Sequence, residues 1–191
     1  MTMRAFLALD VKDGSTIKHI EDIQKRLIQT GADLKPVDPN NLHFTLKFFG
    51  EINDALAIRI KDSLEKVKFE PLHIIYKGMG VFPSPQRISV IWVGVDKICT
   101  NDLFNIANKV EERLRGFTRI DERGFQPHLT VSRVKSGRNR DRLLALIKEH
   151  ENQDFGEEII TSIKLKKSDL TPKGPIYSDV YTFPFEMEQN E

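Results

Sequence analysis

The sequence has 191 residues, of which 39% are hydrophobic and 30% charged, as is ordinary for a globular protein that folds around its own core. Its 29 basic and 28 acidic residues leave a formal net charge of +1. This charge argues against non-specific binding of nucleic acid but leaves room for a local basic groove. Cys99 is the single cysteine, which excludes an internal disulfide and favours a reducing, cytoplasmic location.

The periodicity of apolar residues predicts strands interleaved with helices. The apolar stretch 3–11 is too short for a membrane span and is interpreted as a buried strand, not as a signal peptide. A helix with an apolar stripe follows over residues 13–30, where Asp13 can cap its start and Gly31 ends it. The next predicted elements are a short strand at 34–37, a strand at 42–49, a helix at 53–67 and a strand at 72–77.

The rest of the chain continues the alternation, interrupted by segments rich in glycine and proline. Residues 78–85 hold two glycines and two prolines and are predicted to form a shaped loop. After it come a strand at 88–95, a helix at 101–115, a strand at 128–134, a basic loop at 136–140, a helix at 141–149, and strands at 158–165 and 177–185. The polar tail, 186–191, is expected to fray.

One short pattern, His-apolar-Thr-apolar, occurs twice, within residues 41–48 and 127–133. Side chains alternate between the faces of a strand, so each histidine shares a face with the threonine two positions later while the apolar residues face a core. Strict alternation adds Lys47 to the first polar face and Ser132 to the second. The two histidines, His43 and His128, are separated by nearly half of the chain. We therefore expect two similar lobes, related by a pseudo-twofold axis, with helices outside and sheets lining a central cleft.

Two histidines that face one cleft can supply an acid and a base near neutral pH. Hydrolysis of a phosphodiester needs a base for the incoming oxygen, an acid for the leaving oxygen, and donors for the developing charge. Hydroxyl groups at Thr45 and Thr130 are such donors. The pattern thus predicts action on a phosphate ester, although its symmetry cannot decide which histidine is the base.

Other interpretations of the same residues carry less weight. A single histidine in a strand is more often structural than catalytic, but core packing does not explain a repeated His-Thr face. Zinc needs three or four ligands, and no cluster with ligand spacing accompanies His43 and His128, so neither a metal nor another cofactor is expected. Gly78-Met79-Gly80 lacks the ending of a phosphate loop, and the Gly-x-Ser-x-Gly elbow of serine hydrolases is missing.

Arg133 lies next to the second motif and is the other cation of interest. Its parity is opposite to that of His128, so it can reach the cleft only if its strand bulges or ends before it. The alternative for Arg133, as for Lys47, is a solvated charge on the rim.

The two tetrads resemble the signature of the 2H phosphoesterase superfamily, and most closely its RNA 2′,3′-cyclic phosphodiesterase branch, formerly called 2′-5′ RNA ligases. The resemblance covers nearly the whole chain, through segments 3–9, 41–50, 80–83, 91–95, 125–133 and 168–177. It implies that residues 1–191 form a single bilobal α+β domain, in which antiparallel sheets line the cleft that holds both motifs.

The same resemblance implies metal-independent hydrolysis of a 2′,3′-cyclic phosphate at an RNA or nucleotide end, leaving a 2′-phosphomonoester. The resemblance also implies reversible joining of RNA ends through a 2′-5′ linkage. His128 would be the general base that activates water, and His43 the general acid that protonates the 3′ oxygen. Thr45, Thr130 and Arg133 would hold the phosphate. The implied partner is RNA or a nucleotide with a cyclic end, without a membrane, and the protein is expected to act as a monomer.

Contacts with the bases of an RNA end would come from stacking on aromatic side chains. Phe48, Phe82 and Tyr177 are candidates, with the core as the alternative place for each. Arg138 and Arg140 either guide an RNA backbone or are solvated residues of their loop. Two alternatives to this activity remain: a non-catalytic module that binds nucleotides or RNA ends on the same fold, and a related phosphoesterase that acts on another cyclic phosphate. Binding alone does not need a matched acid and base, which favours an enzyme.

Overall fold

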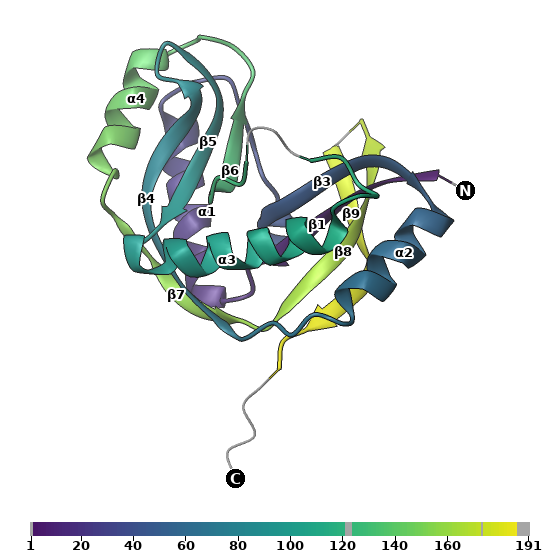
Figure 1. The fold of residues 1–191 in the computed structure, drawn as a ribbon. Coiled ribbons are helices and arrows are strands. Elements are labelled where there is room, and N and C mark those ends of the chain that lie inside the picture. Colours follow the sequence, from purple (N-terminus) through teal and green to yellow (C-terminus); the bar gives the residue numbers. More distant parts are fainter. Residues whose placement is uncertain (1, 121–123, 173, 187–191) are drawn as a thin grey trace.

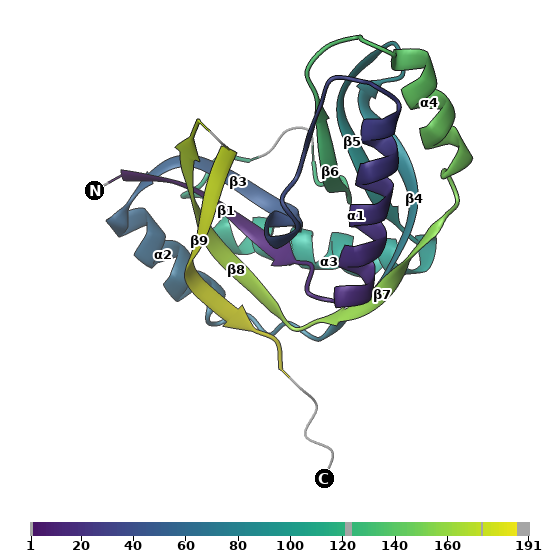
Figure 2. The same ribbon diagram turned by 180° about the vertical axis from the view of Figure 1, so that it is seen from behind.

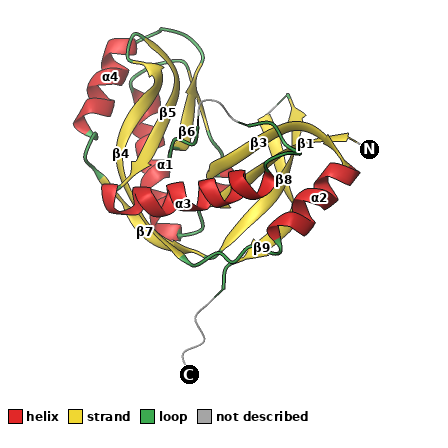
Figure 3. Ribbon diagram, in the orientation of Figure 1, coloured by secondary structure: helices red, strands yellow, loops and turns green. Residues whose placement is uncertain are grey.

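The computed structural model describes residues 2–120, 124–172 and 174–186, and within these ranges the strands form two antiparallel sheets (Figure 1, Figure 3). One sheet has the order β3-β1-β8-β9, with bounds His43–Asn53, Thr2–Asp10, Ser162–Thr171 and Gly174–Pro184. The other has the order β2-β6-β5-β4-β7, with bounds Leu34–Pro36, Leu129–Val134, Arg87–Val95, Leu72–Ser84 and Asp154–Ile160. This arrangement confirms the predicted bilobal α+β fold with antiparallel sheets.

The helices pack against the outer sides of these sheets, as predicted. α1 (Gly14–Gln29) and α4 (Arg140–Glu149) contact the five-stranded sheet, and Figure 2 shows α1 lying across it. α2 (Asp54–Leu64) packs on β3, whereas α3 (Lys97–Leu114) contacts both β3 and β4 and so joins the two sheets. A membrane-spanning helix, long and apolar enough to cross a bilayer, is not found within the described ranges.

The chain passes between the two sheets several times. β1 lies in the four-stranded sheet and β2 in the five-stranded one; β3 returns, β4 to β7 extend the second sheet, and β8 and β9 complete the first. Glu158 of β7 fastens one of these crossings, because its carboxylate accepts hydrogen bonds from the backbone N–H of Lys12 at 3.1 Å and of Asp13 at 3.2 Å. Neither sheet is therefore built from one continuous segment.

The core extends across the boundary between the sheets. Side chains 5–9 of β1 are buried on both faces of that strand. Phe44, inside the first motif, stacks on Tyr76 of β4 with ring centroids 5.8 Å apart. The apolar side of the motif thus packs in a core, as the alternation predicts, and holds the polar side toward the other lobe.

Two of the predicted elements are wrong. The segment 78–85 is not a loop, because β4 continues through it to Ser84 and pairs with β5 along this length. Its glycines serve the strand instead: Gly78 takes a positive φ of 75° at an irregularity in the register, and Gly80 makes room for the Trp92 ring.

The single strand predicted at 158–165 is also two strands, since the chain changes sheets at Thr161, between β7 and β8. Hydrophobic alternation continues through that change and conceals it. Smaller differences concern element ends, such as α3, which begins at Lys97 behind an Asp96 cap. Of the predicted tail, residues 187–191 lie outside the described residues.

Candidate active site

A cavity of about 800 Å³ opens between the two sheets, and both motifs line it. β3, β6 and His128, which directly precedes β6, supply the motif side chains, while β1, β2 and the β8–β9 hairpin form the remaining walls. All five side chains that the sequence predicts for the site line this one cavity: His43, Thr45, His128, Thr130 and Arg133. The fold therefore brings together residues from both halves of the chain.

The two histidines are held by the same hydrogen bond. Nδ1 of His43 lies 2.6 Å from the carbonyl oxygen of Asn41, and Nδ1 of His128 lies 2.7 Å from that of Gln126. A carbonyl can only accept, so Nδ1–H donates in both rings and Nε2 is the nitrogen left for chemistry. At His43, Nε2 is 3.1 Å from Oγ1 of Thr45. The hydroxyl donates to Nε2 when the ring is neutral and accepts from Nε2–H when the ring is protonated.

Aromatic rings hold each imidazole in place. His43 contacts Phe6, at 5.0 Å between centroids, and Tyr177, at 5.4 Å and nearly perpendicular, and these two rings also contact each other. His128 meets Phe82 edge-on at 5.0 Å. Fixed rings matter for proton transfer, because the nitrogen must stay within hydrogen-bond reach of the reacting oxygen.

Burial lowers the pKa of His43, because the charged imidazolium loses solvent. The hydrogen bond to Asn41 and the charge of Asp10 oppose this shift, whereas Lys166 and His128 add to it. The protonated form of His43 is therefore less favoured than in solution, and charged neighbours change its pKa.

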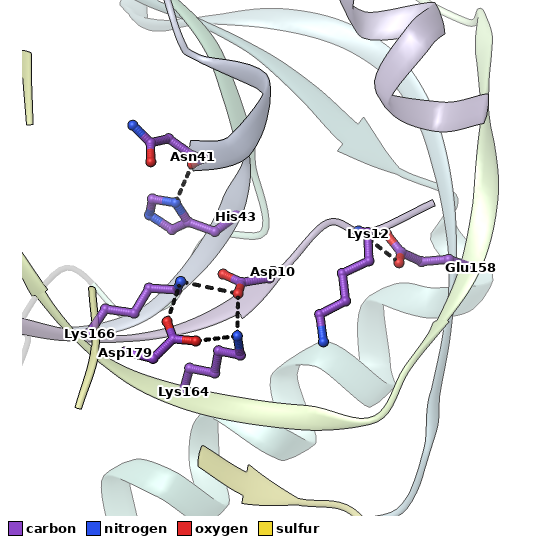
Figure 4. A network of polar contacts seen from close by, with 8 residues as sticks. All are labelled: Asp10, Lys12, Asn41, His43, Glu158, Lys164, Lys166 and Asp179. Atoms are coloured by element: carbon purple, nitrogen blue, oxygen red, sulfur yellow. Dashed lines mark hydrogen bonds and ion pairs between the residues drawn. The ribbon is translucent and has the colours of Figure 1, made fainter. Parts of the chain in front are cut away.

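A cluster of four charged side chains lies beside His43 (Figure 4). Lys164 and Lys166 contact Asp10 at 3.2 Å and 3.1 Å, and both also pair with Asp179. The side chain of Lys166 is only 9% exposed, so the ion pairs are shielded from solvent. Asp10 is also the residue that pairs with His43 in the register between β1 and β3. The cluster therefore places two carboxylates and two ammonium groups, which balance each other's charge, next to His43.

A β-bulge follows Thr45 and corrects one prediction. Leu46 has no partner in the register with β1, so the alternation of side chains reverses beyond it. Lys47 consequently points away from the cavity and forms a buried ion pair with Glu111 of α3; its side chain is 2% exposed. The prediction that Lys47 shares the face of His43 is wrong for this reason.

The second motif has the same bulge, at Val131, which has no partner in the register with β5. Ser132 is therefore buried and does not share the face of His128 as predicted. Arg133 instead turns into the cavity beside Thr130. The condition that the sequence set for Arg133 to reach the cleft, a bulge in its strand, is met.

Phe48 and Arg133 occupy equivalent positions in the two motifs, since each lies five residues after the motif histidine. The bulges turn both side chains into the cavity. Beside Phe48, Arg4 of β1 also lines the cavity, with its guanidinium carbon 5.0 Å from the centre of the Phe48 ring. Arg4 had no predicted role, because a single arginine in an apolar strand forms no pattern in the sequence.

The other sequence candidates are divided between the cavity and its surroundings. Tyr177 lines the cavity, whereas Phe82 packs on His128 outside the lining. Arg138 and Arg140 are exposed and lie outside the lining; Arg140 donates to the carbonyl oxygen of Gln86 at 3.2 Å. Within the described ranges, no three His, Cys, Asp or Glu side chains are grouped so that they could hold a metal ion.

Comparison with known proteins gives a consistent result. The model of the LigT-like phosphoesterase family matches the chain twice, over residues 11–92 and 93–177. An RNA 2′,3′-cyclic phosphodiesterase of Methanothermobacter thermautotrophicus is 42% identical over 185 residues, which cover 96% of this chain and 99% of the relative. The RNA 2′,3′-cyclic phosphodiesterase of Archaeoglobus fulgidus is 39% identical over 183 residues, with 95% and 99% coverage.

Among solved structures, Escherichia coli LigT complexed with 3′-AMP superimposes with a TM-score of 0.76 over 98% of this chain and 100% of that chain, at 18% identity. This likeness supports the fold. The duplicated match and the close relatives cover both motifs, so the chain belongs to the LigT-like phosphoesterases.

Proposed function

We propose that the protein hydrolyses the 2′,3′-cyclic phosphate at the end of an RNA or nucleotide and leaves a 2′-phosphomonoester. The observation that carries the proposal is the pair of histidines with the same Nδ1 hydrogen bond, which leaves two Nε2 atoms for one cavity. The printed names of the relatives, RNA 2′,3′-cyclic phosphodiesterases, support the choice of substrate.

In the proposed reaction, Nε2 of His128 takes a proton from water as the water oxygen forms a bond to phosphorus. The bond between phosphorus and the 3′ oxygen breaks, and its electron pair stays on that oxygen. The proton on Nε2 of His43 passes to the 3′ oxygen, so the products are a 3′ hydroxyl and a 2′ phosphate. At the end of the cycle His128 holds a proton and His43 has lost one, and exchange with solvent restores both.

The hydroxyl groups of Thr45 and Thr130 and the guanidinium of Arg133 would bind the phosphoryl oxygens. Their positions on the cavity wall support this role, because charge builds up on these oxygens as water adds. Arg133 can donate two parallel hydrogen bonds to a phosphate, which a lysine cannot.

The lowered pKa of His43 is a cost if this residue is the acid, since the acid must hold a proton before reaction. The anionic substrate offsets this cost, because a phosphate next to the imidazole favours its charged form. The assignment of His43 as acid and His128 as base rests on the family resemblance. With the 5′ hydroxyl of a second RNA end in place of water, the same groups would join the two ends through a 2′-5′ linkage.

We further propose that the enzyme acts as a monomer in the cytoplasm. The solitary cysteine, Cys99, is buried in the core as a free thiol, which suits a reducing compartment.

The proposal is tested by incubating adenosine 2′,3′-cyclic phosphate with the enzyme in excess EDTA and resolving 2′-AMP from 3′-AMP. We expect 2′-AMP despite the chelator. Turnover that EDTA abolishes would contradict the metal-independent mechanism. His43→Ala and His128→Ala should each lower kcat by about 10²- to 10⁴-fold. Tight nucleotide binding without turnover by the unmodified enzyme would instead indicate a binding module.

A further inference from the structure

The described part of the cavity wall carries more positive charge than one cyclic phosphate requires. Of the described residues, Arg4, Lys35 and Arg133 line the cavity, and Asp38 is the one carboxylate among them. That carboxylate already accepts hydrogen bonds from the backbone and side chain of Asn40. A cyclic phosphodiester has one negative charge, which Arg133 suffices to match. The remaining cations fit a ligand with at least one more phosphate.

Arg4 and Phe48 form a second polar and aromatic unit on the four-stranded side of the cavity. The Arg4 guanidinium lies 5.0 Å from the centre of the Phe48 ring, and Phe48 is 51% exposed. Among the residues that the structure describes, no carboxylate forms an ion pair with Arg4. A half-exposed aromatic ring on a cavity wall offers a flat apolar surface on which a base can stack.

The pseudo-twofold relation between the lobes allows the Arg4–Phe48 unit to be compared with the corresponding position in the second lobe. In the second lobe the cation after the bulge is Arg133 itself, on the motif strand. In the first lobe that position is Phe48, and the cation comes instead from the neighbouring strand, through Arg4. One lobe therefore presents a bare cation, and the other a cation combined with a flat apolar surface.

Arg4 and Arg133 line the same cavity, and Tyr177 lies on its wall with them. The Tyr177 ring contacts His43 at 5.4 Å between centroids, so this part of the wall is next to the first motif. Burial raises the pKa of Tyr177, and the charges of Arg133 and Arg4 oppose that shift. A ligand that fills this one cavity and reaches both arginines needs two anionic groups, as two linked nucleotides have.

We infer that Arg4 and Phe48 form the subsite for the nucleotide on the 5′ side of the cyclic end, so that the enzyme prefers RNA ends of two or more nucleotides to mononucleotides. Arg4 binds the phosphate that links the last two nucleotides, and Phe48 stacks on the base of the penultimate one. Single-stranded RNA is recognised elsewhere by this combination of a cation for the backbone and an aromatic platform for a base. The inference rests on the proposed hydrolysis of 2′,3′-cyclic ends.

The test compares kcat/KM for adenosine 2′,3′-cyclic phosphate with kcat/KM for the ApA dinucleotide that ends in the same group. The unmodified enzyme should favour the dinucleotide by on the order of tenfold, as expected for one stacked base and one phosphate contact. Arg4→Gln and Phe48→Ala should each reduce this ratio. Arg4→Gln should also weaken the salt dependence for the dinucleotide, by a slope of roughly 0.7.

Arg59→Gln is the matched control. Arg59 lies 4.2 Å from the centre of the Phe117 ring, so it makes the same kind of contact as Arg4 outside the cavity lining. Its substitution should leave the dinucleotide preference unchanged. A dinucleotide that lacks the penultimate base tests the stacking separately. With this substrate, Phe48→Ala and the unmodified enzyme should have the same kcat/KM.

Equal kcat/KM for the mononucleotide and the dinucleotide with the unmodified enzyme would overturn the inference while leaving the proposed function intact. Equal losses on both substrates in Arg4→Gln would also overturn it, because Arg4 would then act at the terminal phosphate. Failure to hydrolyse either substrate would instead be a failure of the proposed function.

Discussion

His43 and His128 are oriented by the same contact, a hydrogen bond from Nδ1 to the carbonyl oxygen two residues earlier, at 2.6 Å and 2.7 Å. Their surroundings differ nonetheless. His43 contacts two aromatic rings and lies beside the charged cluster that contains Asp10 and Lys166, whereas His128 contacts Phe82 in a T-shaped arrangement. A symmetric motif in asymmetric surroundings allows the two imidazoles to take different roles.

Asp10→Asn should lower kcat/KM chiefly at alkaline pH. Asp10 raises the pKa of His43 against the effect of burial, so its removal lowers that pKa further. At about pH 8, above the ordinary pKa of histidine, the protonated fraction of His43 falls about tenfold for each unit by which its pKa drops. If His43 is the acid, kcat/KM falls by the same factor. The measurement is kcat/KM against pH for the variant and the unmodified enzyme.

Lys166→Gln is the complementary variant, because Lys166 lowers the pKa of His43 and its loss should raise activity at the same alkaline pH. The pair also tests the assignment of roles. If His43 were the base, its pKa would not affect the rate at alkaline pH, where it is already neutral. Asp10→Asn would then raise the rate at acid pH, which is the opposite result.

Much of this site could be predicted from the sequence, because its signal is local. Two tetrads with the same alternation identify the histidines and threonines without knowledge of the fold. The orientation of Lys47 and Arg133 could not be predicted, since a bulge reverses side-chain parity and no residue type marks one. The charged cluster was missed for another reason: Asp10, Lys166 and Asp179 are far apart in sequence and meet only when β8 and β9 close the first sheet.

Lys47→Ala should destabilise the protein without loss of turnover. The Lys47 ammonium is buried, pairs with Glu111 and donates to the carbonyl oxygen of Arg119 at 2.7 Å, so it ties β3 to α3 and the segment after it. Its removal leaves a largely buried carboxylate without its partner, at a cost of roughly 2–4 kcal/mol. Urea unfolding gives the stability, and kcat is measured at a temperature where the variant is folded.

The control for this prediction is Lys25→Ala, since Lys25 pairs with Asp22 on the surface, where its side chain is 69% exposed. That change should cost less than about 1 kcal/mol. A Lys47→Ala enzyme with normal stability and a much lower kcat would contradict the structure, because it would place this lysine in the cavity.

Gly80→Ala should disturb the support of His128. A Cβ at Gly80 would lie 2.2 Å from the Trp92 ring, so the indole must move. Trp92 packs on Phe82 at 5.3 Å, and Phe82 in turn contacts His128 at 5.0 Å. We expect a loss of about 1–3 kcal/mol in stability together with a lower kcat.

The protein has one tryptophan, so a shift in intrinsic fluorescence reports the displacement of Trp92 directly. Gly137→Ala is the control, because nothing lies within 4 Å of the added Cβ at that position. A clear change in fluorescence with unchanged kcat would mean that Phe82 does not position His128.

Arg133→Gln should lower kcat/KM by about 10²- to 10³-fold, the usual loss when a donor to developing charge is removed. Arg133→Lys should recover only part of this loss, because a single ammonium cannot replace two parallel hydrogen bonds.

Lys135→Gln, two residues along the chain and outside the lining of the large cavity, is the control and should have little effect. Inorganic phosphate should raise the Tm of the unmodified enzyme more than that of Arg133→Gln, since binding to the folded state stabilises it. If Arg133→Lys matches the unmodified enzyme, a point charge is sufficient and the bidentate contact is wrong; if Arg133→Gln keeps its kcat/KM, Arg133 does not bind the reacting phosphate.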